Sequence, residues 1–204
     1  ANMETADSTY WKNVYDEHAS KYDSHMKNWD YQAPKKGAEL IRKFVSLESK
    51  ILDVGCGTGL TGLALQEKGY QNIVGIDISE LMLEQAKKKN IYSEVHQINL
   101  EDKLPFDDNS FNAVFAMGVM TQVAKGKIAA IFRDFCRIVS KGGYIIFNHR
   151  DDLYEKLGYN SEVEKLIDES RWEETFISES ELYLPAHAEY SDKITTRYFV
   201  YKVS

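Results

Sequence analysis

The sequence predicts an α/β fold built on a mostly parallel sheet with helices on both faces. From residue 49 onward, short apolar segments alternate with helical patterns, which is typical of parallel strands joined by crossover helices. Only about a dozen residues, including Pro185, separate the last two strand-like segments, which favours a C-terminal antiparallel strand pair. We therefore expect a seven-stranded sheet, and 204 residues suffice for one compact domain.

The predicted elements follow in a regular order. Two helices at 9–20 and 33–46 precede the sheet, and residues 1–48 are expected to form a helical lid over its ligand-binding edge. Strands are expected at 50–54, 73–78, 94–98, 113–117, 144–147, 172–179 and 193–203. Helices are expected at 58–68, 80–89 with Ser79 as N-cap, 128–139 and 161–171. Lys141-Gly142-Gly143 predicts a C-cap for the helix at 128–139.

The composition favours a globular protein of the cytoplasm. The net charge of −7 argues against nucleic acid as the main partner, because phosphate binding depends on Lys and Arg. No apolar segment approaches the roughly 20 residues that a membrane span needs, and Ala1-Asn2-Met3-Glu4 lacks the regions of a signal peptide. Cys56 and Cys136 are expected as free thiols, which fits a reducing compartment.

A glycine-rich segment follows the first predicted strand. Ile51-Leu52-Asp53-Val54 leads into Gly55-Cys56-Gly57-Thr58-Gly59, after which a helix begins. Glycine admits positive φ and leaves backbone N–H groups open to a ligand at the helix N-terminus. Dinucleotide-binding folds place G-x-G-x-x-G here, whereas this spacing is G-x-G-x-G. Asp53 would repel a pyrophosphate and attract an ammonium group. The alternative is a tight turn that binds nothing.

Together with its downstream motifs, this segment resembles the class I S-adenosylmethionine-dependent methyltransferases over nearly the whole chain. The resemblance rests on residues 51–59, 73–79, 99–111, 114–118 and 139–147. Residues 31–34, 57–60, 79–82 and 148–150 are similar to a subfamily, the methyltransferase-like group of the Williams–Beuren syndrome region. The resemblance implies a Rossmann-like sheet and S-adenosyl-L-methionine as cofactor, with S-adenosyl-L-homocysteine as product. The resemblance further assigns residues 49–204 to the cofactor-binding domain.

The resemblance also assigns cofactor contacts near the carboxyl ends of the strands. The methionine portion would be held by Asp53 and by the loop residues Gly55, Cys56, Gly57, Thr58 and Gly59. Asp77 would accept both ribose hydroxyl groups, because a carboxylate accepts two hydrogen bonds at once. Further contacts are expected from Tyr22 in the lid, Ile78 and Met82 beside the adenine, and Ala116 and Met117 beneath the methionine arm. Core packing is the alternative for Met82 and Met117, and a turn-capping role is the alternative for Asp53.

The third strand ends in a departure from the family pattern. Asn99, followed by Leu100 and Glu101, stands where the family commonly presents an acid to the adenine amino group. An amide oxygen accepts that hydrogen bond without the charge assistance of a carboxylate. We expect these three residues at the adenine, with weaker cofactor binding unless the Leu100 N–H compensates.

The acceptor is expected to be an unidentified small molecule, because the lid is short and the inserts are small. A sulfonium already makes its methyl group electrophilic, so positioning supplies much of the catalysis. Asn148, His149 and Arg150 follow the fifth strand and are the candidate catalytic residues. His149 would act as a base near neutral pH and Arg150 would clamp an anionic substrate. The alternative is a structural role. We expect no metal and a monomer or weak dimer.

Two other functions fit parts of the sequence. A nicotinamide-dependent oxidoreductase is disfavoured by the G-x-G-x-G spacing, by Asp53 and by the antiparallel tail. A catalytically silent partner or regulatory protein that binds S-adenosylmethionine would keep the same loop and Asp77, because a fold does not fix a function.

Overall fold

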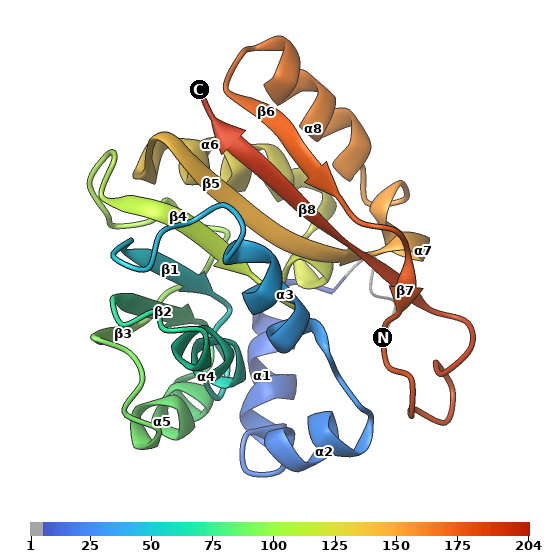
Figure 1. The fold of residues 1–204 in the computed structure, drawn as a ribbon. Coiled ribbons are helices and arrows are strands. Elements are labelled where there is room, and N and C mark those ends of the chain that lie inside the picture. Colours follow the sequence, from blue (N-terminus) through green and yellow to red (C-terminus); the bar gives the residue numbers. More distant parts are fainter. Residues whose placement is uncertain (1–5) are drawn as a thin grey trace.

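The computed structural model describes residues 6–204 and confirms the predicted α/β class (Figure 1). The N-terminal segment 1–5, on which the absence of a signal peptide was judged, lies outside the described residues. The sheet contains the seven expected strands in the order β3-β2-β1-β4-β5-β8-β6, and a short additional strand, β7, pairs with β8. No helix among residues 6–204 has the length and apolar character needed to cross a bilayer.

Five parallel strands form one half of the sheet, and the other half is antiparallel. The parallel strands are β1 (Ile51–Val54), β2 (Ile73–Asp77), β3 (Glu94–Gln97), β4 (Phe111–Ala116) and β5 (Val139–Arg150). β8 (Thr195–Val203) pairs antiparallel with β5, with β6 (Trp172–Ile177) and with β7 (Glu181–Leu182). The strand order reverses between β1 and β4, so the carboxyl ends of β1, β2 and β4 meet at one edge, where α/β sheets bind ligands.

Helices cover both faces of the sheet. α3 (Ala33–Ile41) and α4 (Leu60–Glu67) pack with one buried cluster, and α6 (Ile128–Ile138) and α8 (Tyr159–Asp168) pack with the other. The remaining helices are α1 (Ser8–His18), α2 (Tyr22–Asn28), α5 (Glu80–Lys88), α7 (Asp151–Tyr154) and the 3-10 turns η1 (Met120–Gln122) and η2 (Lys125–Lys127). Ser79 caps α5 as predicted, because its hydroxyl accepts a hydrogen bond from Met82 N at 3.1 Å.

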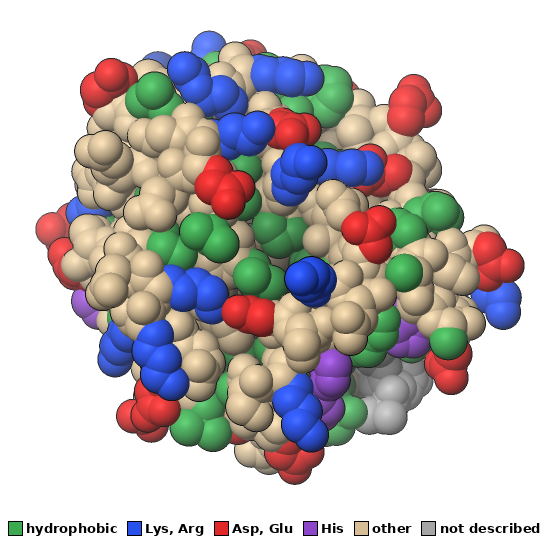
Figure 2. All heavy atoms as spheres, turned by 60° about the horizontal axis from the view of Figure 1, so that its bottom comes forward, with side chains coloured by type: hydrophobic (Ala, Val, Ile, Leu, Met, Phe, Trp, Pro, Cys, Tyr) green, Lys and Arg blue, Asp and Glu red, His purple; other side chains and the backbone are tan. Residues whose placement is uncertain are grey.

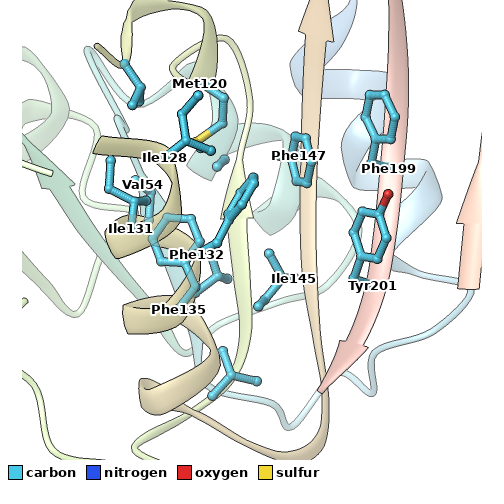
Figure 3. Packing of buried hydrophobic residues seen from close by; sticks show 14 of the residues in the cluster. Val54, Met120, Ile128, Ile131, Phe132, Phe135, Ile145, Phe147, Phe199 and Tyr201 are labelled. Carbon is cyan, nitrogen blue, oxygen red and sulfur yellow. The ribbon is translucent and has the colours of Figure 1, made fainter. Parts of the chain in front are cut away.

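Aromatic side chains fill the core beneath α6. Figure 3 shows Phe132 on this helix opposite Phe147 on β5, with Phe199 and Tyr201 on the neighbouring strand β8. The Phe147 ring lies 5.3 Å from the Phe132 ring and stacks on Phe199 at 5.0 Å. This contact joins the antiparallel tail to the parallel half, so the tail is part of the same hydrophobic core.

The structure corrects the prediction for the end of α6. The helix ends at Ile138, and Val139 already belongs to β5 and pairs with Phe111. The Ser140 hydroxyl donates to the backbone oxygens of Asn109 and Phe111 at 3.0 and 3.1 Å. Gly142, with φ of +80°, therefore lies within an irregular strand start and not in a helix cap. At its other end β5 extends to Arg150, so residues 148–150 lie inside the sheet.

Candidate functional site

A cavity that is partly open to solvent, with about 770 Å³ of free space in and above it, lies at the carboxyl ends of β1, β2 and β4. A smaller one of about 280 Å³ adjoins it and shares Tyr22, Gly55, Gly57 and Met117 with it. Figure 2 turns the lower part of Figure 1 toward the reader and shows hydrophobic side chains in a recess among charged ones. Ten of the predicted cofactor residues line the larger cavity: Tyr22, Gly55, Gly57, Asp77, Ile78, Met82, Asn99, Leu100, Glu101 and Met117.

The glycine loop folds against β2 and the segment after β4. Gly55, Gly57 and Gly59 have φ values of +66°, +52° and +94°, which other residues rarely adopt. A Cβ atom on Gly55 would also lie 2.5 Å from the side chain of Val119, so this position admits only glycine without rearrangement. Gly59 precedes α4 as its left-handed N-cap residue. The loop therefore needs its glycines for backbone shape and for close approach.

Asp77 connects the glycine loop to α5. One carboxylate oxygen accepts from Gly57 N at 2.9 Å and the other accepts from Ser79 N at 2.9 Å. Burial raises the pKa of Asp77, and the backbone hydrogen bonds act in the opposite direction. These two hydrogen bonds fix the orientation of the carboxylate at the end of β2, where Asp77 also lines the cavity.

Asp53 lies behind the loop and lines neither cavity. It is fully buried, and its Oδ2 accepts from Thr61 Oγ1 at 2.6 Å and from Tyr92 Oη at 2.7 Å. Burial raises the pKa of Asp53 to about 7. This placement differs from the expected ammonium acceptor, since the side chain points into a protein network. Cys56 and Thr58 line only the smaller cavity, and Gly59 and Ala116 line neither.

Asn99 is already engaged by its neighbours. Its Nδ2 donates to Ser8 Oγ at 3.2 Å, and its Oδ1 accepts from Glu101 N at 3.0 Å. The Glu101 carboxylate in turn accepts from Ala124 N at 3.2 Å. These bonds tie the end of β3 to α1 and to the segment after η1, so the amide that was predicted to contact adenine has a structural role as well.

Two of the cavity residues that the sequence analysis missed carry unpaired polar atoms. Trp11 Nε1 and Gln122 Oε1 both belong to lining residues, and both are buried without a hydrogen-bond partner among residues 6–204. They give the cavity one unsatisfied donor and one unsatisfied acceptor near Ser8 and Asn99. Trp11 shares a face of α1 with Ser8 and Tyr15, and that helical spacing was the available signal. Nothing in the sequence pattern indicated Gln122.

The N-terminal helices are bound to the loop and to α5. Asp16 on α1 accepts from Ser79 Oγ at 2.5 Å. Asp23 on α2 accepts from Thr58 Oγ1 at 2.5 Å and pairs with Lys89 Nζ at 2.9 Å. Lys89 also donates to Thr58 O at 2.6 Å. α1 and α2 thereby lie over the cavity, held by charged and polar contacts at its rim.

The predicted catalytic residues Asn148, His149 and Arg150 do not line either cavity. His149 is 1% exposed, and its Nδ1 donates to Arg150 O at 2.8 Å. Burial lowers the pKa of His149 to about 4, so the ring is neutral near pH 7, and its position excludes the expected base role. Arg150 binds the Asp152 carboxylate at 2.8 and 3.0 Å.

Asn148 reaches the cavity indirectly, through Gly118. Its Oδ1 accepts from Gly118 N at 2.7 Å, and its Nδ2 donates to Thr196 Oγ1 at 3.1 Å. Gly118 lines the larger cavity and has a φ of +78°. Asn148 on β5 therefore fixes the turn after β4 through Gly118, and is itself held by Thr196 on β8, which is a positioning role.

Comparison with known proteins relates this chain to methyltransferases. Residues 51–143 match the family described as a methyltransferase domain. Human methyltransferase-like protein 27 is 26% identical over 166 residues, 78% of this chain and 66% of that protein. The mouse eEF1A lysine and N-terminal methyltransferase is 30% identical over 111 residues, 53% of this chain and 16% of that protein. The ubiquinone biosynthesis O-methyltransferase of Alkalilimnicola ehrlichii is 29% identical over 197 residues, 87% of this chain and 78% of that protein.

These identities support a shared family, but the 26% identity to methyltransferase-like protein 27 does not indicate the close relationship that the short motifs suggested. Solved structures agree in fold. The cyclase SpnF is 15% identical with a TM-score of 0.74, covering 100% of this chain and 99% of that one. Geranyl diphosphate C-methyltransferase from Streptomyces coelicolor A3(2), crystallised with S-adenosyl-L-homocysteine, is 11% identical with a TM-score of 0.66, covering 83% and 77%. Residues 51–143 therefore match a methyltransferase domain, and the fold is the one found in S-adenosylmethionine-dependent methyltransferases.

Proposed function

We propose that this protein binds S-adenosyl-L-methionine and transfers its methyl group to a small-molecule acceptor. The observation that carries the proposal is the cavity at the strand switch point, where the glycine loop and Asp77 meet beneath α1. The curated relatives named above include methyltransferases for a protein and for ubiquinone biosynthesis, so they leave the acceptor class open. A recessed cavity beneath α1, open to solvent on one side, supports a small molecule over a folded protein.

The lining groups fit the proposed cofactor. Asp77 would accept the ribose hydroxyl groups, and the backbone of Gly55 and Gly57 would lie along the methionine portion, with Met117 and Tyr22 on either side. An adenine edge presents a donor beside an acceptor, which matches the unsatisfied Gln122 Oε1 and Trp11 Nε1. We assign adenine recognition to these two side chains together with Ile78, Met82 and the backbone of Leu100.

Catalysis in this proposal depends on position. The cofactor supplies an electrophilic methyl group when bound. The chain contributes orientation and exclusion of water, which are worth on the order of 7–11 kcal/mol in well-aligned reactions. Residues 6–48 act as the lid over residues 49–204, because Asp16 and Asp23 bind the rim. The free thiols of Cys56 and Cys136 support a cytoplasmic location.

The test is calorimetric titration with S-adenosyl-L-methionine and S-adenosyl-L-homocysteine, with NAD as the control ligand. We expect micromolar binding of the first two only. Asp77→Asn and Gln122→Ala should each weaken binding by roughly tenfold or more, because each leaves polar cofactor atoms unpaired. Asp168→Asn, an exposed carboxylate on α8, is the matched control. Folded protein that binds neither compound, or binds NAD instead, would refute the proposal. Binding without methyl transfer to any acceptor would indicate the catalytically silent alternative.

A further inference from the structure

Four tyrosines from four separate segments lie at or beside the two cavities. They are Tyr15 on α1, Tyr22 on α2, Tyr31 before α3 and Tyr183 after β7, and we call them the tyrosine cluster. The Tyr15 and Tyr22 rings lie 6.1 Å apart, and the Tyr31 and Tyr183 rings lie 5.6 Å apart. Burial raises the pKa of all four, and the Tyr183 hydroxyl adds to the effect at the other three. The four hydroxyl groups therefore stay protonated.

Three members of the cluster line the cavities: Tyr15 and Tyr22 line the larger one, and Tyr22 and Tyr31 line the smaller one. Tyr183 lines neither and packs against Tyr31. The Tyr31 hydroxyl reaches the turn after β4, since a Cβ atom placed on Gly118 would lie 2.3 Å from it. It is buried and makes no hydrogen bond of standard geometry among residues 6–204, and its polar neighbour is the Tyr183 hydroxyl. A buried donor without a well-formed hydrogen bond is costly unless a ligand uses it.

The cavity walls supply hydrogen-bond donors and no free base. Of the described lining residues, Asp77 and Glu101 are the carboxylates, and both already accept backbone N–H groups. No histidine among residues 6–204 lines either cavity. The Arg150 guanidinium lies behind the cluster, 5.9 Å from the Tyr183 ring centroid. An acceptor that must lose a proton therefore finds no group in the walls to take it.

We propose that the methyl acceptor is a carboxylate, bound by the hydroxyl group of Tyr31, with Tyr183 and the Arg150–Asp152 pair behind it. This inference rests on the proposed function. A carboxylate oxygen forms the new O–CH₃ bond while the S–CH₃ bond breaks, and the electron pair of the broken bond stays on sulfur. The products are a methyl ester and a neutral thioether, and no proton is released. Inside a buried site a carboxylate attracts the sulfonium, whereas an ammonium group repels it.

Matched acids and amines test this acceptor class. The purified full chain is incubated with S-adenosyl-L-methionine carrying a deuterated methyl group and with 3-phenylpropanoate or 3-phenylpropylamine. A series of straight-chain acids of about four to about ten carbons and their matching amines extends the panel. Products are quantified by mass spectrometry, and alkaline treatment releases labelled methanol from esters alone. We expect ester formation at least about tenfold faster than amine methylation. Its rate should be nearly constant between about pH 6 and about pH 9, because carboxylates are ionised throughout.

Conservative variants connect the result to the tyrosine cluster. Tyr31→Phe should lower kcat/KM for the acid by about five- to tenfold, as expected for a lost hydrogen bond to a charged group. Tyr183→Phe should lower it less, because Tyr183 acts through Tyr31. Their affinity for S-adenosyl-L-homocysteine should stay within about twofold of the parent. Tyr10→Phe, at an exposed tyrosine of the same helix as Tyr15, is the matched control.

Four other outcomes would contradict a carboxylate acceptor, and the first is methylation of amines as fast as of acids. The second is a rate that rises about tenfold per pH unit, as loss of a proton from the acceptor would require. The third is a Tyr31→Phe variant with the same kcat/KM as Tyr10→Phe. The fourth is a protein that binds S-adenosyl-L-homocysteine but methylates no acid of the panel. Failure to bind S-adenosyl-L-homocysteine instead refutes the proposed function itself, so the two failures are distinguishable.

Discussion

Single residues in this protein divide into those that face the cavity and those that hold its walls in shape. Asp53 and Asn148 belong to the second kind, although the sequence suggested direct roles for both. Asp53 binds Thr61 and Tyr92 behind the glycine loop, and Asn148 binds Gly118 from the sheet. A residue type and a position along a strand do not reveal to which side of a loop the side chain turns. The structure had to supply that direction.

Asp53 should make the stability of the protein depend on pH. Its pKa is raised from 3.8 to about 7, so below about pH 4 it is neutral in both the folded and unfolded states. Between about pH 4 and pH 7 the unfolded chain releases this proton while the folded protein keeps it, so stability falls as pH rises. Above about pH 7 the loss is constant, at roughly 4 kcal/mol at most.

Asp53→Asn removes this titration while keeping a side-chain oxygen for Thr61 and Tyr92. We expect the free energy of unfolding of the variant, relative to the parent, to increase by a few kcal/mol between about pH 4 and about pH 8. Urea denaturation at both pH values measures the difference. Asp168→Asn, on the surface of α8, controls for the general loss of one charge. Parallel behaviour of the Asp53 variant and the parent at the two pH values would contradict the raised pKa.

At the scale of elements, the lid consists of α1 and α2 bound to the rim by a few polar contacts. Asp23→Ala removes both the Thr58 hydrogen bond and the Lys89 ion pair. We expect faster dissociation of S-adenosyl-L-homocysteine, by roughly threefold to tenfold, and faster amide exchange in α2, because the helix loses its attachment to the loop. Stopped-flow and hydrogen exchange measure the two effects.

Glu17→Ala, at an exposed carboxylate of α1, is the control for the lid experiment. If Asp23→Ala and Glu17→Ala released the ligand at the same rate, the rim contacts would not hold the lid. A result in which amide exchange rises but dissociation does not would show that α2 moves independently of ligand release.

The elements themselves were largely predictable, and their ends were less so. Apolar spacing located α6, but its C-terminus was wrong because Lys141-Gly142-Gly143 resembles a helix cap while Val139 already pairs with Phe111. That pairing involves a residue 28 positions away in the sequence, so no local signal contains it. α2 and β7 were missed because they are short. The cavity residues at strand ends could be predicted, because the carboxyl ends of parallel strands meet at one edge of the sheet whatever their separation in the sequence.

For the whole molecule, the antiparallel tail is joined to the parallel half by stacked aromatic rings. Phe199 is 1% exposed and stacks on Phe147 at 5.0 Å and on Tyr154 at 4.8 Å. Phe199→Ala should lower the free energy of unfolding by about 3–5 kcal/mol, through lost burial and a residual cavity. Denaturant melts followed by both far-UV and near-UV circular dichroism measure this loss.

Coincident far-UV and near-UV transitions are expected, because one core spans both halves of the sheet. Phe176→Ala, at a partly exposed phenylalanine of β6, is the control and should cost far less. A variant in which the tail melts separately from the parallel half would contradict a single cooperative unit.

α1 contacts the cavity at Ser8, at Trp11 and at Tyr15, so a single helix borders both the proposed adenine end and the tyrosine cluster. Because the helix is one rigid element, it cannot withdraw from one end while it stays seated at the other. Arrival of the acceptor and departure of the spent cofactor would then share one gate. In kinetic terms, the two exchange steps become coupled, and the rate at which this helix undocks sets an upper bound on turnover.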